Sequence, residues 1–130
     1  MNKMNNITFG ALGEKHAVKF LKKKKYKILE KNYKTKLGEI DIIAEKDGYI
    51  VFTEVKSRSA DPLLSGVYAV DRNKQRHIIR TASFYLKQND CELQPRFDII
   101  EIEIDRNNSK VISYNHIENA FIWEGGYAPF

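Results

Sequence analysis

Two β-like runs joined by an Asp-Gly pair at 47–48 constrain the fold of this chain more than any other feature. The runs are residues 37–46 (LGEIDIIAEK) and residues 49–57 (YIVFTEVKS). An Asp-Gly pair between two such runs is among the strongest short-range signals for a tight hairpin turn. The sequence therefore predicts an antiparallel hairpin in which Lys46 pairs with Tyr49.

This register brings charged side chains together at the far end of the hairpin. Counting back from the turn, Asp41 is expected opposite Glu54, and Glu39 opposite Lys56. Opposed side chains have Cβ atoms about 4.5–5.5 Å apart, and like charges placed so are destabilising. A divalent cation bridging the two acids would remove that repulsion, so the pattern predicts a metal site. The alternative is an exposed face whose Glu39–Lys56 ion pair is worth about 0–1 kcal/mol.

Residues 8–25 are predicted to form a helix with one acid on its apolar side. Glu14 falls within a stripe at helical spacing, and lysines lie outside it; the apolar positions are Ala11, Ala17, Val18 and Leu21. The helix dipole favours an acid near the start of a helix. It does not explain why the acid faces inward, where an unpaired charge is costly. Glu14 is therefore a candidate for the same site as Asp41 and Glu54.

The remaining segments complete an alternating order of helices and strands. Strands are expected at 26–34, 96–104 and, as a short last strand, 110–114. Asp71 is expected to cap a second helix at 71–89, whose buried side would carry Ile78, Ile79, Ala82, Tyr85 and Leu86. Residues 58–70, with Pro62 and Gly66, predict a long loop.

The resulting order is α-β-β-β-α-β-β. The helix between the third and fourth strands allows those two strands to pair in parallel. The sequence thus predicts an α/β fold: a mixed β-sheet of about five strands flanked by helices, in a single domain covering 1–130.

Charge is unevenly distributed along the chain. The net charge is +5, and the first 36 residues hold 11 lysines but only 2 glutamates. A basic region beside an acidic cluster suits a protein that attracts a polyanion and uses metals, although a lysine-rich solvated surface would look similar. The residues predicted to contact phosphates are Lys22, Lys23, Lys24, Lys25, Arg58, Arg72, Lys74, Arg76 and Arg80.

Several other classes of protein are disfavoured. The single cysteine, Cys91, excludes an internal disulfide, and the histidines lack zinc-site spacing. No stretch approaches the roughly 20 apolar residues of a membrane span, and the start of the chain has no apolar signal-peptide core, so we expect a cytoplasmic protein with no membrane partner. The aromatic tail, AFIWEGGYAPF, is expected to pack on the domain or on a second copy, as in a homodimer.

Four segments together resemble the PD-(D/E)XK nuclease superfamily. They are GALGEKHAVKFL, LGEIDIIAEKDG, FTEVKSRS and RFDIIEI, which span roughly residues 9–104. The chain looks most like the uncharacterised bacterial YraN-like proteins, and beyond them like the archaeal Holliday-junction resolvases. It departs from the superfamily pattern at Ile40, where many members have proline, and it lacks a Q-x-x-x-Y pattern after the second hairpin strand.

The resemblance implies a restriction-endonuclease-like fold and metal-dependent hydrolysis of phosphodiesters, with DNA as the substrate. It implies Asp41 and Glu54 as ligands of Mg²⁺ or Mn²⁺, Lys56 at the attacking water and Glu14 as an additional acid. The Val55 carbonyl is expected to be a further ligand, because hard ions prefer oxygen. The expected activity is that of a deoxyribonuclease, with branched or junction DNA in repair or recombination as the finer expectation. The alternatives are a non-catalytic nucleic-acid-binding domain and a scaffold for another protein.

Overall fold

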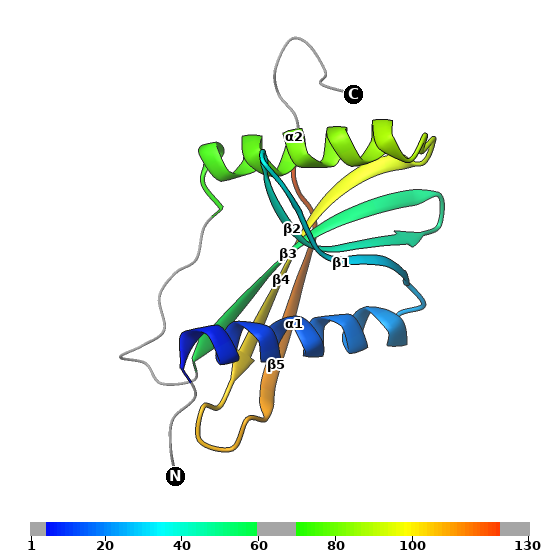
Figure 1. Ribbon diagram of the computed structural model, residues 1–130. Coiled ribbons are helices and arrows are strands. Elements are labelled where there is room, and N and C mark those ends of the chain that lie inside the picture. Colours follow the sequence, from blue (N-terminus) through cyan, green and yellow to red (C-terminus); the bar gives the residue numbers. More distant parts are fainter. Residues whose placement is uncertain (1–4, 60–69, 123–130) are drawn as a thin grey trace.

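Within residues 5–59 and 70–122, which the computed structural model describes, two helices pack on opposite faces of a five-stranded sheet (Figure 1). The elements are α1 (Asn6–Lys23), β1 (Lys27–Thr35), β2 (Gly38–Lys46), β3 (Tyr49–Ser59), α2 (Arg72–Gln88), β4 (Gln94–Ile104) and β5 (Val111–Phe121). The strands lie side by side in chain order; β3 and β4 are parallel, and the other neighbours are antiparallel. The predicted α/β class and element order are confirmed.

The hairpin of β2 and β3 has the predicted turn and register. Lys46 pairs with Tyr49, and the ladder continues to the pair Ile42–Thr53. Both residues at 47–48 have positive φ, at 50° and 85°. This is the combination that a two-residue type I′ loop requires, and Asp-Gly is among the sequences that adopt it most readily.

The core is divided between the two faces of the sheet. Because side chains alternate along a strand, neighbouring residues of β2 and β3 enter different clusters. On the α2 side lie Ile43, Ile50, Phe52 and Phe97 with the predicted buried side of α2, namely Ile78, Ile79, Ala82, Tyr85 and Leu86. On the α1 side lie Ile42, Ala44, Val51, Ile100, Ile102 and Ile104 with Ala17, Val18 and Leu21. Burying one such side chain stabilises by about 1.5–3 kcal/mol, so both helices are held firmly.

The ends of the elements follow local hydrogen bonding. The side chain of Asp71 accepts a hydrogen bond from the backbone N–H of Lys74 at 2.8 Å, which makes it the predicted N-cap of α2. Neither described helix is long and apolar enough to cross a membrane.

Several predicted boundaries are wrong, among them those of the first helix, predicted at 8–25 and observed at Asn6–Lys23. The last strand, β5, is not limited to 110–114 but runs to Phe121, because it pairs along nearly all of β4. Its side chains are mostly exposed, so no apolar alternation marked it. The expected loop at 58–70 starts later, since Arg58 and Ser59 extend β3 alongside β4. Residues 60–69 and 123–130, with most of the aromatic tail, lie outside the described residues.

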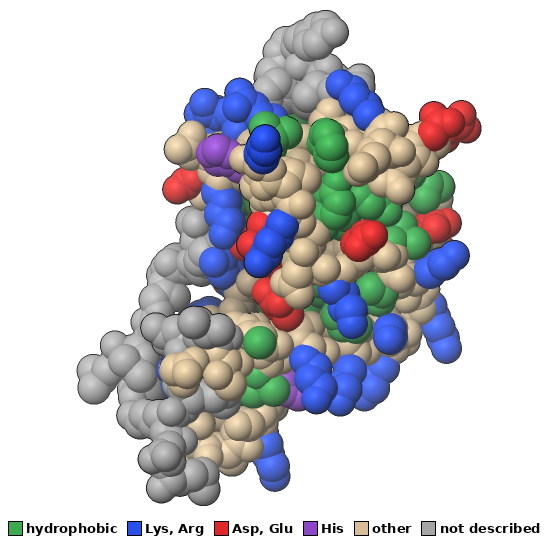
Figure 2. Space-filling model, in the orientation of Figure 1, with side chains coloured by type: hydrophobic (Ala, Val, Ile, Leu, Met, Phe, Trp, Pro, Cys, Tyr) green, Lys and Arg blue, Asp and Glu red, His purple; other side chains and the backbone are tan. Residues whose placement is uncertain are grey.

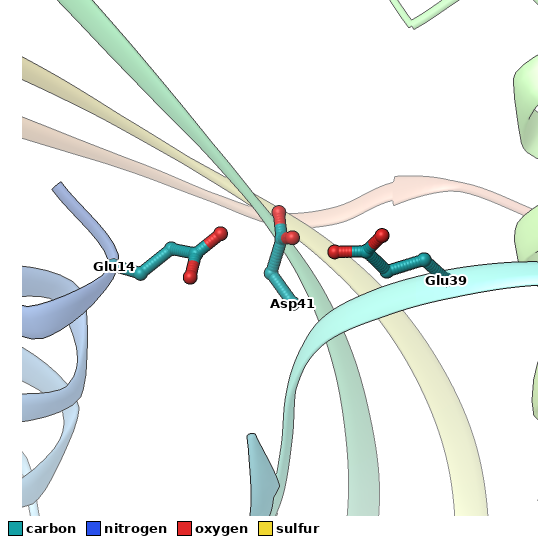
Figure 3. A group of neighbouring side chains, drawn as sticks. All are labelled: Glu14, Glu39 and Asp41. Carbon is teal, nitrogen blue, oxygen red and sulfur yellow. The ribbon is translucent and has the colours of Figure 1, made fainter. Parts of the chain in front are cut away.

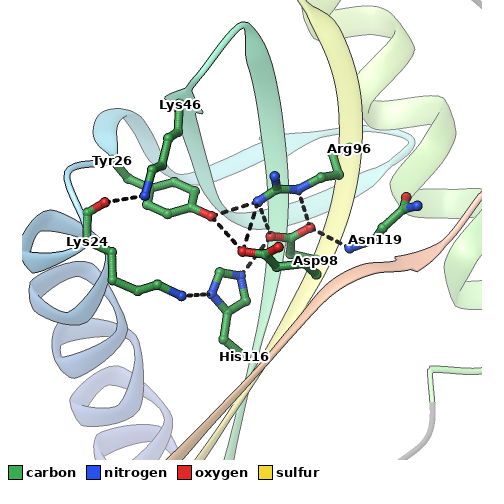
Figure 4. A network of polar contacts seen from close by, with 8 residues as sticks. Lys24, Tyr26, Lys46, Arg96, Asp98, His116 and Asn119 are labelled. Atoms are coloured by element: carbon green, nitrogen blue, oxygen red, sulfur yellow. Dashed lines mark hydrogen bonds and ion pairs between the residues drawn. The ribbon is translucent and has the colours of Figure 1, made fainter.

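A buried polar network ties the end of α1 to β4 and β5 (Figure 4). Asp98 accepts hydrogen bonds from Arg96 Nε at 2.9 Å and Nη2 at 2.8 Å, from His116 Nε2 at 2.7 Å, and from the backbone N–H of Asn119 at 2.9 Å. The Lys24 ammonium donates to His116 Nδ1 at 2.8 Å. An ammonium can only donate, so the proton on the ring sits at Nε2, toward Asp98. The network fixes where α1 ends relative to the sheet.

Candidate metal centre

Asp41 lies where β2 separates from β3. β2 stays paired with β1 as far as Thr35–Gly38, but its ladder with β3 ends at Ile42–Thr53. The side chain of Asp41 enters the opening, where one carboxylate oxygen accepts the backbone N–H of Val55 at 2.8 Å. The fold thus places a buried carboxylate next to the end of the two-stranded ladder, beside the start of the Glu-Val-Lys triplet.

The predicted direct pairs Asp41–Glu54 and Glu39–Lys56 are therefore not part of the ladder formed by these strands. The register is as predicted from the turn to Ile42, but β2 bends toward β1 before it reaches the acids.

Glu14 reaches this opening from α1. Its carboxylate points toward Asp41 (Figure 3), and one oxygen each from Glu14, Glu39 and Asp41 lie within 4.8 Å of one another. The close approach of α1 depends on Gly13, because a Cβ there would come within 1.8 Å of Ser57 Oγ. The nearby Gly10 has open space around it. Of the two glycines before Glu14, only Gly13 is needed for this contact.

Glu39 is a member of the acid cluster that sequence reasoning did not select as a ligand. It was expected opposite Lys56, with which it would form an ordinary ion pair. Glu39 and Asp41 stand two residues apart on β2, and residues at that spacing share one face of a strand. That spacing was the available signal.

Glu54 is adjacent to the cluster but has a cationic partner of its own. It lines a cavity of about 310 Å³ together with Glu39 and Asp41. Lys74, from the first turn of α2, places its ammonium 2.7 Å from Glu54 Oε1, whereas Lys56 lies 3.9 Å from the same oxygen. Lys74 was predicted to contact phosphates, and the structure brings it to the acids instead.

Burial and mutual repulsion shift the acids of this centre toward protonation. Burial raises the pKa of Asp41 to about 8, with Glu54, Glu14 and Glu39 adding to the rise and the Val55 N–H opposing it. Burial likewise raises the pKa of Glu14, and hydrogen bonds to Asp41 and Asn32 oppose that shift. Such a centre holds its negative charge at a cost, unless a cation is added.

Basic side chains surround the acids on the face seen in Figure 2, where lysines and arginines lie on both sides of the central acidic groups. The other predicted phosphate contacts are dispersed: Lys22 lines a cavity beside Asp41; Lys23 and Lys25 are exposed at the end of α1; Lys24 is bonded to His116; Arg58 is half-buried on β3; and Arg72, Arg76 and Arg80 are exposed on α2.

Residues 13–102 match the model of the uncharacterised protein family UPF0102. The match begins at the glycine that precedes Glu14 and includes β2, β3, α2 and most of β4. The chain belongs to UPF0102.

Relatives within UPF0102 are similar over nearly their whole length. A UPF0102 protein of Caldanaerobacter subterraneus subsp. tengcongensis is 47% identical over 122 residues, which cover 93% of this chain and 100% of the relative. One from Clostridioides difficile is 45% identical over 119 residues, covering 91% and 100%. One from Persephonella marina is 43% identical over 113 residues, covering 86% and 91%. Their names assign the family and no activity.

The chemistry of the donor set in this UPF0102 chain suits a hard divalent cation. Such ions prefer carboxylate and other oxygen ligands. Oxygens bound to Mg²⁺ at about 2.1 Å lie roughly 3–4 Å from one another, so Glu14, Glu39 and Asp41 are a small side-chain movement from that arrangement. Glu54 can join them where Lys74 withdraws. The Val55 carbonyl stays a predicted ligand, because the contact found involves its N–H.

Proposed function

We propose that this protein is a metal-dependent nuclease of the PD-(D/E)XK type that hydrolyses phosphodiester bonds of DNA. The observation that carries the proposal is the convergence of acids from α1, β2 and β3 on the buried Asp41, with Lys56 two residues after Glu54 on β3. A structural role alone would not call for a buried carboxyl at Asp41 with further acids beside it, because burying a charge is costly.

The residues take the following roles in the proposed reaction. Asp41 and Glu14, with Glu39 or Glu54, hold Mg²⁺ or Mn²⁺. When bound, the ion supplies a Lewis acid and lowers the pKa of a coordinated water. Lys56 orients the attacking water or stabilises charge on the phosphoryl oxygens. The water oxygen forms the new bond to phosphorus and gives up a proton to solvent, the bond to the leaving oxygen breaks, and that oxygen takes a proton from solvent. We extend the proposal to branched or junction DNA in repair or recombination, on the resemblance to junction resolvases alone.

A second candidate is a nucleic-acid-binding domain that keeps the nuclease fold without catalysis. The contact of Lys74 with Glu54 favours it, because an ammonium at 2.7 Å takes a place that a metal ion would otherwise use. In this alternative the protein binds DNA with a salt-sensitive affinity, as phosphate contacts require, and leaves the strand intact.

The deciding experiment is an incubation of the purified protein with branched, nicked and linear DNA, in Mn²⁺, Mg²⁺ or EDTA. We expect cleavage with metal and none with EDTA. Asp41→Asn and Glu54→Gln should abolish cleavage while DNA affinity stays within a few-fold, because phosphate contacts lie mostly elsewhere. Glu92→Gln, at an exposed acid after α2, is the matched control and should cleave normally. Metal-independent products, or full activity of Asp41→Asn, would refute the assigned centre.

A further inference from the structure

A groove beside the acids carries lysines on two walls. It is a cavity of about 360 Å³ that opens between α1 and the pair β1–β2, with Glu14 and Asp41 among its lining residues. One wall carries Lys15, Lys19 and Lys22 of α1, and Lys31 of β1 also lines the cavity. The apolar lining includes Val18 and Ile42. The acid centre and a strongly basic channel are therefore parts of one continuous depression.

The lysines of this groove lie close enough to repel one another. Lys15 and Lys19 are four residues apart on α1, and like charges at this helical spacing destabilise by a few tenths of a kcal/mol. Within residues 5–59 and 70–122, none of the four groove lysines forms an ion pair with an acid. A solvated helix face would explain three lysines on α1. It does not explain why β1 adds Lys31 to the same cavity.

The spacing of the lysines suits a run of phosphates. With a rise of about 1.5 Å per residue, Lys15 and Lys22 are about 10 Å apart along the axis of α1. A stacked nucleic-acid strand rises about 3.4 Å per nucleotide, so this wall spans about three nucleotides. Lysine stems and Val18 also offer apolar surface for sugars and bases, and stems used in this way are common.

We infer that this groove binds one unpaired phosphodiester strand and leads it to the acids. The walls bear positive charge on both sides of a single depression, which matches one backbone. A duplex carries its two backbones on a convex surface, and its second strand would have no place between α1 and β1. The inference rests on the proposed function only in placing the scissile phosphate at Asp41. It names the substrate class as nucleic acid with a single-stranded flank, such as a flap or a splayed arm.

The test is a binding measurement that requires no cleavage. Fluorescence anisotropy in EDTA compares a short labelled single strand with a duplex of the same sequence, at several salt concentrations. For Lys15→Ala/Lys19→Ala/Lys31→Ala we expect single-strand affinity to fall about tenfold or more, and the salt slope to flatten by about 2, at about 0.7 per lost phosphate contact. Duplex affinity should change by less than the single-strand affinity does. The same measurement with a DNA strand and with an RNA strand shows which of the two nucleic acids the groove binds more tightly.

The matched control removes the same charge elsewhere. Lys27→Ala/Lys87→Ala/Lys110→Ala changes three exposed lysines on β1, α2 and the turn before β5, none of which lines the groove. It should reduce affinity by less than threefold. Equal losses in both triple variants, or an unchanged salt slope in the groove variant, would overturn the inference. A second groove variant, Lys19→Glu, provides the same comparison with a single exposed side chain.

The experiments distinguish an error in the groove inference from an error in the nuclease proposal. If the groove variant binds single strands normally while metal-dependent cleavage depends on Asp41, the nuclease proposal stands and the groove inference is wrong. If the groove variant loses single-strand binding while neither protein cleaves DNA, the groove stands without the nuclease.

Discussion

Asp41 on β2 and Asp98 on β4 are two buried aspartates with opposite surroundings. Asp98 is fully buried and accepts four hydrogen bonds, two of them from the Arg96 guanidinium. Asp41 is 8% exposed, accepts the N–H of Val55, and lies close to the carboxylates of Glu14 and Glu39. Burial alone would raise the pKa of both; at Asp98 the hydrogen bonds from His116, Arg96 and Asn119 outweigh it and lower the pKa.

The difference teaches which buried charge serves the fold and which serves a ligand. Asp98 is neutralised within the chain, so its network stabilises the junction of α1, β4 and β5 without any outside partner. Asp41 has further acids close to it, and the ion pairs of Lys74 and Lys56 are with Glu54. A buried site with more negative than positive charge is a functional candidate, because strongly shifted pKa values cluster at binding and catalytic sites.

The largest effect should come from breaking the compensated site. Asp98→Ala leaves the Arg96 charge buried without its carboxylate. Breaking a buried ion pair in this way lowers the free energy of unfolding by about 3–5 kcal/mol. Urea unfolding followed by circular dichroism measures the loss. Glu92→Gln, which removes an exposed acid, should change stability by less than about 0.5 kcal/mol. If Asp98→Ala is as stable as wild type, the network does not hold β5 and α1 together.

Metal should act on the other aspartate. A ligand at 100 times its dissociation constant stabilises by about 2.7 kcal/mol, so millimolar Mg²⁺ or Mn²⁺ should raise the melting temperature of the wild type. Asp41→Asn replaces a carboxyl group that can ionise among the other acids only at a cost with a neutral amide, so the metal-free variant should be at least as stable as wild type and should lose the metal response. Calorimetry at neutral pH, with and without metal, measures both. A variant that keeps the full shift would show that the ion binds elsewhere.

The pH dependence of the metal-free protein should separate the two sites. Between the ordinary pKa of an aspartate and about 8, folded Asp41 retains a proton that the unfolded chain has lost. Stability should therefore fall as pH rises through this window, by at most about 1.4 kcal/mol per pH unit for one group. Asp98 acts in the opposite sense, since its lowered pKa gives stability that is lost only in acid.

Urea unfolding in EDTA across that window measures the slope. In Asp41→Asn the decline should flatten, whereas a variant outside the cluster, Glu92→Gln, should keep it. Stability of the wild type that rises steadily from mildly acidic to mildly alkaline pH would contradict the assignment of a protonated Asp41.

The smallest effect concerns Lys74, whose ammonium lies 2.7 Å from Glu54. Lys74→Gln removes the partner of Glu54; because the Lys74 side chain is 41% exposed, the lost pairing is worth only about 0.5 kcal/mol. The same variant should bind metal more tightly if Glu54 becomes a ligand when Lys74 leaves. Arg80→Gln, exposed on the same helix, is the control. Isothermal titration with Mn²⁺ compares the two, and equal affinities would assign Lys74 a purely structural role.

Sequence patterns predicted the parts of this fold that depend on local chemistry. The Asp-Gly pair set the hairpin register, Asp71 capped α2, and helical spacing identified the buried side of α2. The sequence did not predict the full length of β5, because its side chains are mostly polar and exposed and its extent is set by pairing with β4. The Asp98 network was not predicted for a related reason. Arg96, His116 and Lys24 are far apart in the chain, and no local sequence pattern connects them.

The sequence predicted which residues belong to the candidate centre better than it predicted how they are arranged. Glu14 and Asp41 were expected together and are found together. Glu39 joins them because β2 bends away from β3, and a register counted from the turn contains no bend. Lys74 reaches Glu54 because the first turn of α2 comes close to the middle of β3, a placement decided by packing across the sheet.

The position of the 47–48 turn also orders the events by which the centre is assembled. A hairpin closes from its turn, in microseconds, so Lys46 and Tyr49 should meet first and Ile42 and Thr53 last. The acids then arrive at an end that has no further rungs to form, and their repulsion opposes only the final step of closure. β4 can add to β3 only after the whole crossover has been made, which is the slow, non-local part of folding. We therefore expect mutations of the acids to leave the folding rate almost unchanged and to alter chiefly the rate of unfolding.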